Sequence, residues 1–296
     1  TTYYLKSTKN GKSKQINMNN KFKKIYEDSL NNPEEFWKNI SEDVFWFRKP
    51  SKILNKSNPP FYKWFEDGIT NTCYNALDFH IEKGRGDKTA LIYDSPITGN
   101  NTKFTFNELK KKVSRFAGAL DKQGIKKGDR VIIYMPMIPE AVVAMLACGR
   151  IGAIHSVVFG GFASNELASR IDDSKAKILI TASCGFEPGR TVEYRPLVDS
   201  ALKLAKHKIE KVILYQRKDH EIKLNEPLEI SWEQSLVNAV DKDCIEMDSN
   251  DLAYILYTSG TTGVPKGIVR DVGGHIVALK WTMKNIYNID TDDVWW

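Results

Sequence analysis

Apolar residues recur in two alternating patterns from about residue 87 onward, and these patterns predict helices and strands in turn. The apolar positions between Leu109 and Leu120 keep helical spacing, and Gly124 follows where a helix commonly ends. Shortly afterwards, Val131–Met135 is a continuous apolar run, typical of a parallel strand that is buried on both faces. One helix and one buried strand are therefore expected between residues 109 and 135.

The same patterns continue to the end of the chain. We expect helices over 139–148, 196–205 and 276–286, a further helix capped by Ser164, and strands over 154–158, 177–181, 212–215, 252–257 and 267–269. Strands that alternate with helices of this length indicate βαβ units. The sequence therefore predicts an α/β fold with a mostly parallel sheet flanked by helices.

Residues 1–80 lack this alternation. Residues 1–25 are rich in Lys, Asn, Ser and Thr, which predicts a disordered basic tail. Residues 26–80 carry many aromatic side chains among prolines and acids, with no period held for long. A platform for single-stranded nucleic acid would place more basic residues between the rings. We expect the segment 26–80 to pack irregularly onto the domain formed by residues 81–296.

Charge and composition narrow the class of protein. The net charge of the 296 residues is +6, but residues 1–26 hold seven lysines and no acid, so the rest of the chain is close to neutral. The hydrophobic fraction of 42% is that of a globular protein. This composition excludes a disordered chain, a collagen-like repeat and a small disulfide scaffold. The nearly neutral charge of the rest of the chain gives no support for a nucleic-acid partner.

The cysteines and the most apolar stretch exclude two further classes. Cys73, Cys148, Cys184 and Cys244 form no CxxC pair and no Cys/His cluster in the sequence, so we expect no metal site and no disulfide framework. The stretch 131–149 has the length of a membrane span, but prolines and a glutamate interrupt it. We expect a soluble chain without a membrane partner, in a reducing compartment.

The two ends of the sequence are unusual for a complete protein. The chain begins with Thr1 and ends with Val294-Trp295-Trp296, which would leave two adjacent indoles exposed at a terminus. We therefore expect a piece of a longer protein.

The strongest chemical signal follows the apolar run 252–257. The loop contains three glycines, four hydroxyl side chains and one lysine, in the order Thr258-Ser259-Gly260-Thr261-Thr262-Gly263-Val264-Pro265-Lys266-Gly267. Glycines let backbone N–H groups approach an anion, hydroxyls add donors, and the lysine adds a positive charge. These are the components of a polyphosphate site.

The class of phosphate site follows from the context of Lys266. A Walker A lysine follows a glycine and opens a helix, whereas Lys266 follows Pro265 and precedes a predicted strand. The sequence also lacks the glycine-rich loop and the HRD triplet of protein kinases. P-loop NTPases and protein kinases are therefore excluded.

The segment Tyr257–Gly267 resembles the phosphate-loop signature of the AMP-forming adenylating enzymes, a superfamily that includes acyl-CoA synthetases, luciferases and peptide-synthetase adenylation domains. Within it, His155–Phe162, Ala168–Asp173 and Pro33–Trp37 are similar to short-chain acyl-CoA synthetases of the acetate and propionate type. Glu187–Arg190 and Val269–His275 are closer to the propionate branch. The resemblance spans about residues 26–296, and it implies that 81–296 is a truncated adenylation domain, incomplete at its C-terminus.

The resemblance also implies a reaction. A carboxylate attacks the α-phosphate of ATP, giving an acyl-adenylate and pyrophosphate with the help of Mg²⁺, and the thiol of coenzyme A then displaces AMP. By the family's pattern, the ATP phosphates would contact Thr258, Ser259, Gly260, Thr261, Thr262, Gly263 and Lys266. The expected partners are small molecules: a short-chain acid, ATP and coenzyme A.

Three further assignments rest on the same resemblance. Coenzyme A would contact Glu187, Pro188, Gly189 and Arg190, with Arg190 on its 3′-phosphate. Acetate-type relatives carry a second arginine where this chain has Glu187, and a carboxylate cannot pair with a phosphate, so the phosphate contact would rest on Arg190 alone. Trp296 would line the acyl pocket. The family's catalytic lysine would lie beyond residue 296, so we expect the chain by itself to be inactive and poorly soluble.

Several alternatives stay open. The substrate could be a longer acid or an amino acid, or the chain could bind ATP without reacting. The sequence does not separate acetate from propionate, cytoplasm from mitochondrial matrix, or one oligomeric state from another. Among the remaining residues, His155 is expected to be a core histidine bonded to the backbone, and Asp172-Asp173 a solvated or capping pair.

Overall fold

The computed structural model describes residues 18–218, 220–258 and 265–296, with side chains from residue 22 onward. Its helices are α1 (Met18–Asn31), α2 (Pro33–Ser41), α3 (Phe106–Lys122), α4 (Pro139–Arg150), α5 (Ser164–Ser174), α6 (Arg195–Leu204), α7 (Trp232–Leu236) and α8 (Gly273–Asn285), with two short π-helical segments, η1 (Tyr74–Asp78) and η2 (Ile81–Arg85).

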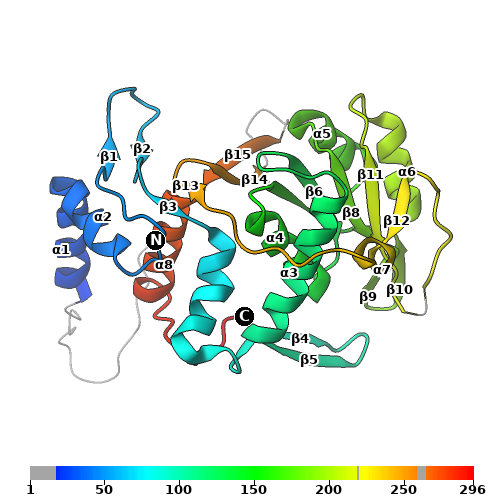
Figure 1. Ribbon diagram of the computed structural model, residues 1–296, viewed down its shortest axis with the longest axis horizontal. Coiled ribbons are helices and arrows are strands. Elements are labelled where there is room, and N and C mark those ends of the chain that lie inside the picture. Colours follow the sequence, from blue (N-terminus) through cyan, green and yellow to red (C-terminus); the bar gives the residue numbers. More distant parts are fainter. Residues whose placement is uncertain (1–17, 219, 259–264) are drawn as a thin grey trace, which may run out of the picture.

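One large sheet organises the molecule (Figure 1). Its strands, in spatial order, are β12 (Glu229–Ser231), β11 (Lys211–Tyr215), β8 (Ile178–Ala182), β6 (Arg130–Met135), β7 (Ile154–Phe159), β14 (Leu252–Thr258) and β15 (Lys266–Asp271). All neighbours are parallel except β14 and β15, which form an antiparallel hairpin. The predicted mostly parallel α/β fold is confirmed.

Four small antiparallel pairs complete the strands. They join β1 (Leu54–Asn55) to β2 (Lys63–Trp64), β3 (Ile69–Thr70) to β13 (Met247–Asp248), β4 (Thr89–Ser95) to β5 (Asn100–Thr105), and β9 (Cys184–Glu187) to β10 (Arg190–Glu193). The β9–β10 hairpin follows β8 almost directly, so it extends from the end of a central strand of the large sheet.

The order of the strands explains why the central part of the sheet is buried on both faces. The connection β6–α4–β7 moves one way across the sheet, and β7–α5–β8 returns past β6 to its other side. Because such crossovers share one hand, α4 and α5 lie on opposite faces. Helices α3, α4 and α7 pack together, as do α5 and α6. Every residue of β8 is buried as a result.

The N-terminal segment forms a second, smaller core. Val44, Trp46, Ile53 and Phe65 pack with residues of β13, β14 and α8, and the rings of Phe36 and Trp37 each lie 6.3 Å from that of Trp281. Figure 1 shows α1 and α2 beside α8, away from the β11–β12 edge. The expected packing onto the domain surface is confirmed.

The expected irregular backbone of this segment is wrong, because it contains α1 and α2. Pro33 opens α2 at its first turn, two acids follow, and Phe36, Trp37 and Ile40 form one apolar face. Nine residues are too few to show a sustained period. Helix α1 likewise places residues 18–25 in a helix, where a disordered tail was expected, whereas residues 1–17 lie outside the described residues.

Most predicted elements of the large domain agree with the structure to within a few residues. Gly124 ends α3 with a left-handed φ of 83°, as expected. The predicted Ser164 cap is wrong: Ser164 is the first residue of α5, the capping position belongs to Ala163, and no side chain caps the helix.

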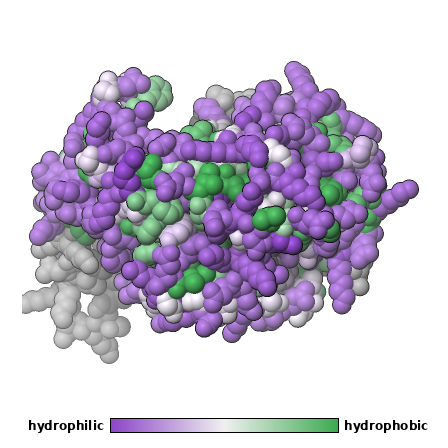
Figure 2. All heavy atoms as spheres, viewed as in Figure 1, coloured by the Kyte–Doolittle hydropathy of each residue, from purple (hydrophilic) through white to green (hydrophobic). Residues whose placement is uncertain are grey.

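The surface gives no sign of a membrane-spanning helix. Among the described residues, no helix combines the length and the apolar character that crossing a bilayer requires. Figure 2 shows hydrophilic side chains over most of the visible face, with apolar ones gathered mainly near its middle. The apolar stretch 131–149 is divided between buried strand β6 and helix α4, as predicted.

Candidate active site

The candidate site lies where the parallel strands of the large sheet have their carboxyl ends. Strands β6, β7, β8 and β14 are parallel, so their carboxyl ends meet at the same edge. The chain leaves β6 toward β7 on one side and β8 toward β11 on the other, which makes the β6–β8 boundary a topological switch point. Ligands of open parallel sheets bind outside the carboxyl ends at such points.

The predicted phosphate loop connects two strands at this edge. Thr258 ends β14 and Lys266 begins β15, and the two residues are register partners in the antiparallel hairpin. The side chains of both are exposed. Ser259, Gly260, Thr261, Thr262 and Gly263 lie outside the described residues. The structure therefore defines the two ends of the loop, and the hairpin brings Lys266 back to the strand end that carries Thr258.

A tyrosine joins the base of this loop to helix α5. The hydroxyl of Tyr257 donates to Asp173 Oδ2 at 2.6 Å, and the guanidinium of Arg170 lies 5.2 Å from the centre of the Tyr257 ring. Arg170 also pairs with Glu166 at 2.7 Å. Burial and the bond to Asp173 raise the pKa of Tyr257, which keeps the hydroxyl protonated as a donor. These contacts hold the residue next to Thr258 in a defined position.

The predicted coenzyme A segment forms the turn of the β9–β10 hairpin. Glu187 ends β9, Gly189 has a left-handed φ of 75°, and Arg190 begins β10. Both Nε and Nη2 of Arg190 contact Glu187 Oε2, at 2.7 and 2.6 Å. The two side chains are largely exposed, which leaves the pair weak in water. The carboxylate of Glu187 thus neutralises the guanidinium of Arg190, the group expected to contact the 3′-phosphate of coenzyme A.

Two buried tyrosines connect this hairpin to the loop after β7. The hydroxyl of Tyr134 donates to Phe162 O at 2.8 Å and accepts from Gly161 N at 3.2 Å. The ring of Tyr194 lies 5.1 Å from that of Tyr134, and a Cβ atom on Gly160 would overlap the Tyr194 hydroxyl. Only glycine fits at that position, so the ends of β6 and β7 and the β9–β10 hairpin form one packed unit.

Trp296 belongs to no such packed unit among the described residues. Its side chain is fully exposed at the last residue, while the ring of Trp295 lies 4.5 Å from that of Tyr287. No acyl pocket is formed around Trp296 by the described residues. The assignment of Trp296 to such a pocket stays a prediction.

His155 differs from the expected backbone-bonded histidine. It lies in β7 with its ring 5.5 Å from that of Tyr254, and its buried Nδ1 has no hydrogen-bond partner among the described residues. Burial lowers the pKa of His155 to about 4, so the ring is neutral. The hydroxyl of Tyr254 lies 2.8 Å from His275 Nε2 on α8. The two histidines therefore flank one tyrosine of β14.

The pair Asp172-Asp173 was expected to be solvated or capping, and the structure instead shows both side chains bonded to other parts of the chain. Asp172 Oδ1 accepts from His207 N at 2.7 Å, and Asp173 accepts from the Tyr257 hydroxyl.

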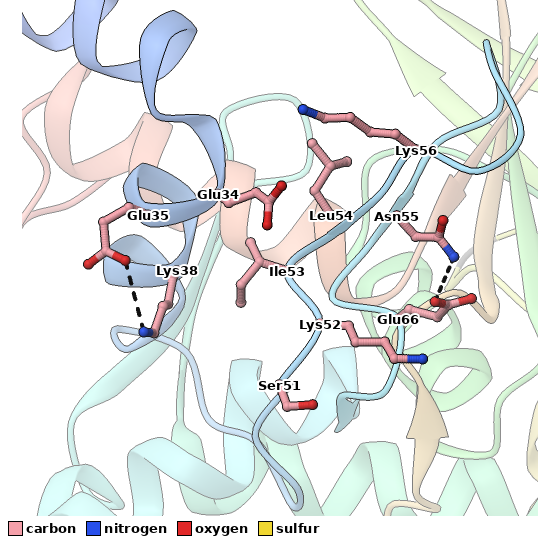
Figure 3. A pocket seen from close by; sticks show the side chains of 10 residues that line it. All are labelled: Glu34, Glu35, Lys38, Ser51, Lys52, Ile53, Leu54, Asn55, Lys56 and Glu66. Atoms are coloured by element: carbon pink, nitrogen blue, oxygen red, sulfur yellow. Dashed lines mark hydrogen bonds and ion pairs between the residues drawn. The ribbon is translucent and has the colours of Figure 1, made fainter.

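A surface groove of about 590 Å³ lies between α2 and the β1–β2 hairpin (Figure 3). Three glutamates and three lysines line it, and Lys38–Glu35 and Asn55–Glu66 contacts compensate part of the charge. The groove contains none of the predicted site residues.

One constellation escaped the sequence analysis. Cys73, Asp78 and Cys244, remote in the sequence, place their Sγ and carboxylate atoms within 4.8 Å of one another. The sequence contains no CxxC pair and no Cys/His cluster, so the proximity of this pair was not expected. Cys148 and Cys184 are buried elsewhere. The guanidinium of Arg150 contacts all three groups, so a positive charge already occupies the place that a metal ion would need.

Comparison with known proteins identifies the class. The profile of the family described as "AMP-binding enzyme" matches residues 79–296, and that of "Acetyl-coenzyme A synthetase N-terminus" matches residues 22–76. The chain belongs to the AMP-binding enzyme family.

Individual relatives agree with this membership. "Acyl-CoA synthetase short-chain family member 3, mitochondrial" of Homo sapiens is 50% identical over 93% of this chain, and "Acetyl-coenzyme A synthetase" of Rubrobacter xylanophilus is 41% identical over 92%. The solved "Acetoacetyl-CoA Synthetase from Streptomyces lividans" superposes with a TM-score of 0.81 at 26% identity, covering 90% of this chain and 40% of its own. The chain spans about 40% of the length of these curated relatives.

Proposed function

We propose that this chain is the ATP- and coenzyme A-binding part of an AMP-forming acid–thiol ligase for a short-chain carboxylate, acetate or propionate. The carrying observation is the β14–β15 hairpin, which brings Lys266 opposite Thr258 at the carboxyl edge of a parallel sheet, around a loop of glycines and hydroxyls. The names of the two relatives support the substrate class. The human relative is designated "mitochondrial", which supports the matrix as compartment, with the cytoplasm as the alternative.

The reaction divides into two displacements. A carboxylate oxygen attacks the α-phosphorus of ATP, and the bond to the bridging oxygen breaks to release pyrophosphate. The sulfur of coenzyme A then attacks the acyl carbonyl carbon, loses its proton, and AMP leaves. The first step builds negative charge on pyrophosphate, so preorganised donors lower its barrier. We assign this role to Lys266, the Thr258 hydroxyl and the amides and hydroxyls of residues 259–263.

Mg²⁺ enters this proposal together with ATP. Within the described ranges, the one set of three candidate ligands is Cys73, Asp78 and Cys244, whose thiols do not suit a hard cation. When bound to the nucleotide, Mg²⁺ adds charge neutralisation on the phosphates.

ATP binding tests the assignment of Lys266. We expect Lys266→Gln to weaken Mg·ATP binding about tenfold or more, because a charge-assisted contact to phosphate is lost. Lys103→Gln is the matched control, since Lys103 is also an exposed lysine of a strand hairpin, β4–β5. Isothermal titration measures both. Equal affinity of the two variants and the unaltered chain would remove Lys266 from the site.

Turnover tests the substrate class. We expect exchange of labelled pyrophosphate into ATP that requires acetate or propionate, measured on a protein that carries this chain at the full length of the curated relatives. The ranking of acetate, propionate and butyrate names the acid. Exchange only with longer acids or amino acids would favour the alternative ligase, and tight ATP binding without any exchange would favour a non-catalytic binding protein.

The Glu187–Arg190 pair makes a further prediction about coenzyme A. In the free hairpin Arg190 is engaged by Glu187, so Glu187→Gln should release it for a phosphate. We expect affinity for coenzyme A to rise severalfold, while affinity for dephospho-coenzyme A, which lacks the 3′-phosphate, stays the same. A rise for both ligands, or for neither, would contradict the contact between Arg190 and the 3′-phosphate.

A further inference from the structure

The buried cluster of Cys73, Asp78, Arg150 and Cys244 lies outside the candidate active site and joins three remote parts of the chain. Cys73 and Asp78 belong to the η1 region, Arg150 ends α4, and Cys244 lies in the connection between α7 and β13. Arg150 and Cys73 are fully buried, while Cys244 is partly exposed. The cluster therefore has a buried interior and one member that solvent can reach.

Arg150 organises the cluster through several contacts. Its Nη1 lies 2.7 Å from Asp78 Oδ2, 3.1 Å from Cys244 Sγ and 3.5 Å from Cys73 Sγ, and its Nε donates to Lys242 O at 2.5 Å. Lys110 adds a second cation, 2.9 Å from Asp78 Oδ1. Asp243 lies 3.9 Å from Nη2 but its side chain is in solvent. Arg150 thus contacts one buried carboxylate and two sulfurs, and Lys110 contacts the same carboxylate.

This charge pattern favours a thiolate in the pair. Burial and the charge of Asp78 oppose ionisation of Cys73, but the hydrogen bond from Cys244 and the charge of Arg150 outweigh them and lower the pKa of the Cys73 thiol. Cys148 provides the contrast: it is equally buried without a charged partner, and burial raises its pKa to about 12. Thiolate character determines reactivity toward oxidants, so the two buried cysteines differ in kind.

The backbone around the cluster already holds the two sulfurs together. The side chain of Asn71 donates to Gly149 O and to Ile245 O, both at 2.9 Å, and accepts from Cys73 N at 2.8 Å. Strand β3, which ends just before Asn71, pairs with β13, which begins just after Ile245 and Glu246. The segments that carry Cys73 and Cys244 are therefore joined independently of their sulfur atoms.

We propose that Cys73 and Cys244 form a reversible disulfide when hydrogen peroxide oxidises them. The Cys73 thiolate attacks one peroxide oxygen, the O–O bond breaks, and the leaving hydroxide takes a proton to become water. The resulting Cys73 sulfenic acid is attacked by the sulfur of Cys244. The S–O bond breaks, the S–S bond forms, and the second water leaves with the thiol proton. Two thiols lose two electrons, and one peroxide becomes two waters.

Thiol counting tests the proposal on the 296-residue chain. The native protein is treated with hydrogen peroxide, quenched, unfolded, and its thiols are titrated with and without prior dithiothreitol. The thiol count should fall from the four cysteines of the chain to two and return to four with the reductant. Peptide mapping of the unreduced sample should show Cys73 joined to Cys244, with a mass two hydrogens below the sum of the separate peptides.

Single variants serve as matched controls. Cys73→Ser should keep three thiols under peroxide. Cys244→Ser should fall from three to two, because Cys73 stops at a sulfenic acid that dithiothreitol reverses, whereas Cys148→Ser should fall from three to one. The peptide map of the unaltered chain decides the matter even where a variant fails to fold. A different pairing, equal oxidation of Cys148, or sulfinic acid at Cys73 that dithiothreitol does not reverse would overturn the proposal.

Discussion

Strands β8 and β14 lie in the same sheet with only β6 and β7 between them, yet their surroundings differ. All five residues of β8 are buried, whereas Ala253 alone among the seven residues of β14 is buried. Its hairpin partner β15 has no buried residue. Packing by helices on both faces determines the position of β8. The β14–β15 hairpin instead depends on a few side-chain contacts, such as Tyr257 with Asp173.

The difference separates the strands that stabilise the fold from the hairpin that carries the candidate site residues. Strands β6, β8 and β11 hold the apolar core, while the hairpin carries Lys266 and Thr258 toward solvent. Segments that must admit a ligand commonly belong to the less stable part of a fold, because few apolar contacts hold them. Large effects on global stability are therefore expected in the interior strands, and small, local ones in the hairpin.

The largest expected effect compares two isoleucines. Ile133 in β6 is fully buried, whereas Ile268 in β15 is 39% exposed. We expect Ile133→Ala to lower the free energy of unfolding by about 2–5 kcal/mol, because it opens a cavity in a close-packed core. Ile268→Ala should cost less than about 1 kcal/mol. Urea denaturation measures both, and similar losses would show that the hairpin is held as tightly as the core.

The second effect uses pH to probe the border between the two regions, where His155 of β7 stacks on Tyr254 of β14. Burial lowers the pKa of His155 to about 4, against about 6.5 in an unfolded chain. The folded state thus favours the neutral ring. The stability that this contributes is fully present above about pH 6.5 and is lost as the pH falls toward 4, by up to about 3 kcal/mol.

His155→Phe removes this titration and keeps an aromatic ring against Tyr254. The free energy of unfolding of the unaltered chain should fall relative to that of the variant between pH 6.5 and 4. His80, whose pKa burial also lowers to about 4, is present in both proteins and cancels in the difference. Parallel curves for the two proteins would mean that acid does not act on stability through His155.

The smallest effect concerns the hairpin alone. Tyr257→Phe removes the hydrogen bond to Asp173, and we expect a global loss of only about 0.5–1 kcal/mol because the acceptor is exposed. Amide hydrogen exchange of residues 252–271 should accelerate while that of β8 is unchanged. Tyr287→Phe is the matched control, since the Tyr287 hydroxyl has no hydrogen bond within the described ranges. Acceleration in both variants, or in β8 as well, would contradict local anchoring by Tyr257.

The same contrast explains what the sequence could predict. Strands β6, β7 and β8 were predictable because burial on both faces produces continuous apolar runs. The short helix α2 was not, because its apolar face comprises few residues. The phosphate loop was proposed from its residue types and the 187–190 turn from its resemblance to acyl-CoA synthetases, and both assignments stay predictions. Their supports were not, because Tyr257 and Asp173 lie 84 positions apart and neither residue type by itself indicates a contact. The proximity of Cys73 to Cys244 was hidden for the same reason.

The position of β14 also has a consequence for the order in which the chain folds. Its parallel partner is β7, with Tyr254 opposite His155, although β8, β11 and β12 come between them in the sequence. During synthesis, the strands from β6 to β12 can assemble before β14 emerges. Until the hairpin docks, β7 is an open edge with unpaired backbone groups, a surface on which another chain can add a strand. Docking of the hairpin that carries the candidate phosphate loop thus covers the edge of β7, and β15 becomes the outer strand of the sheet.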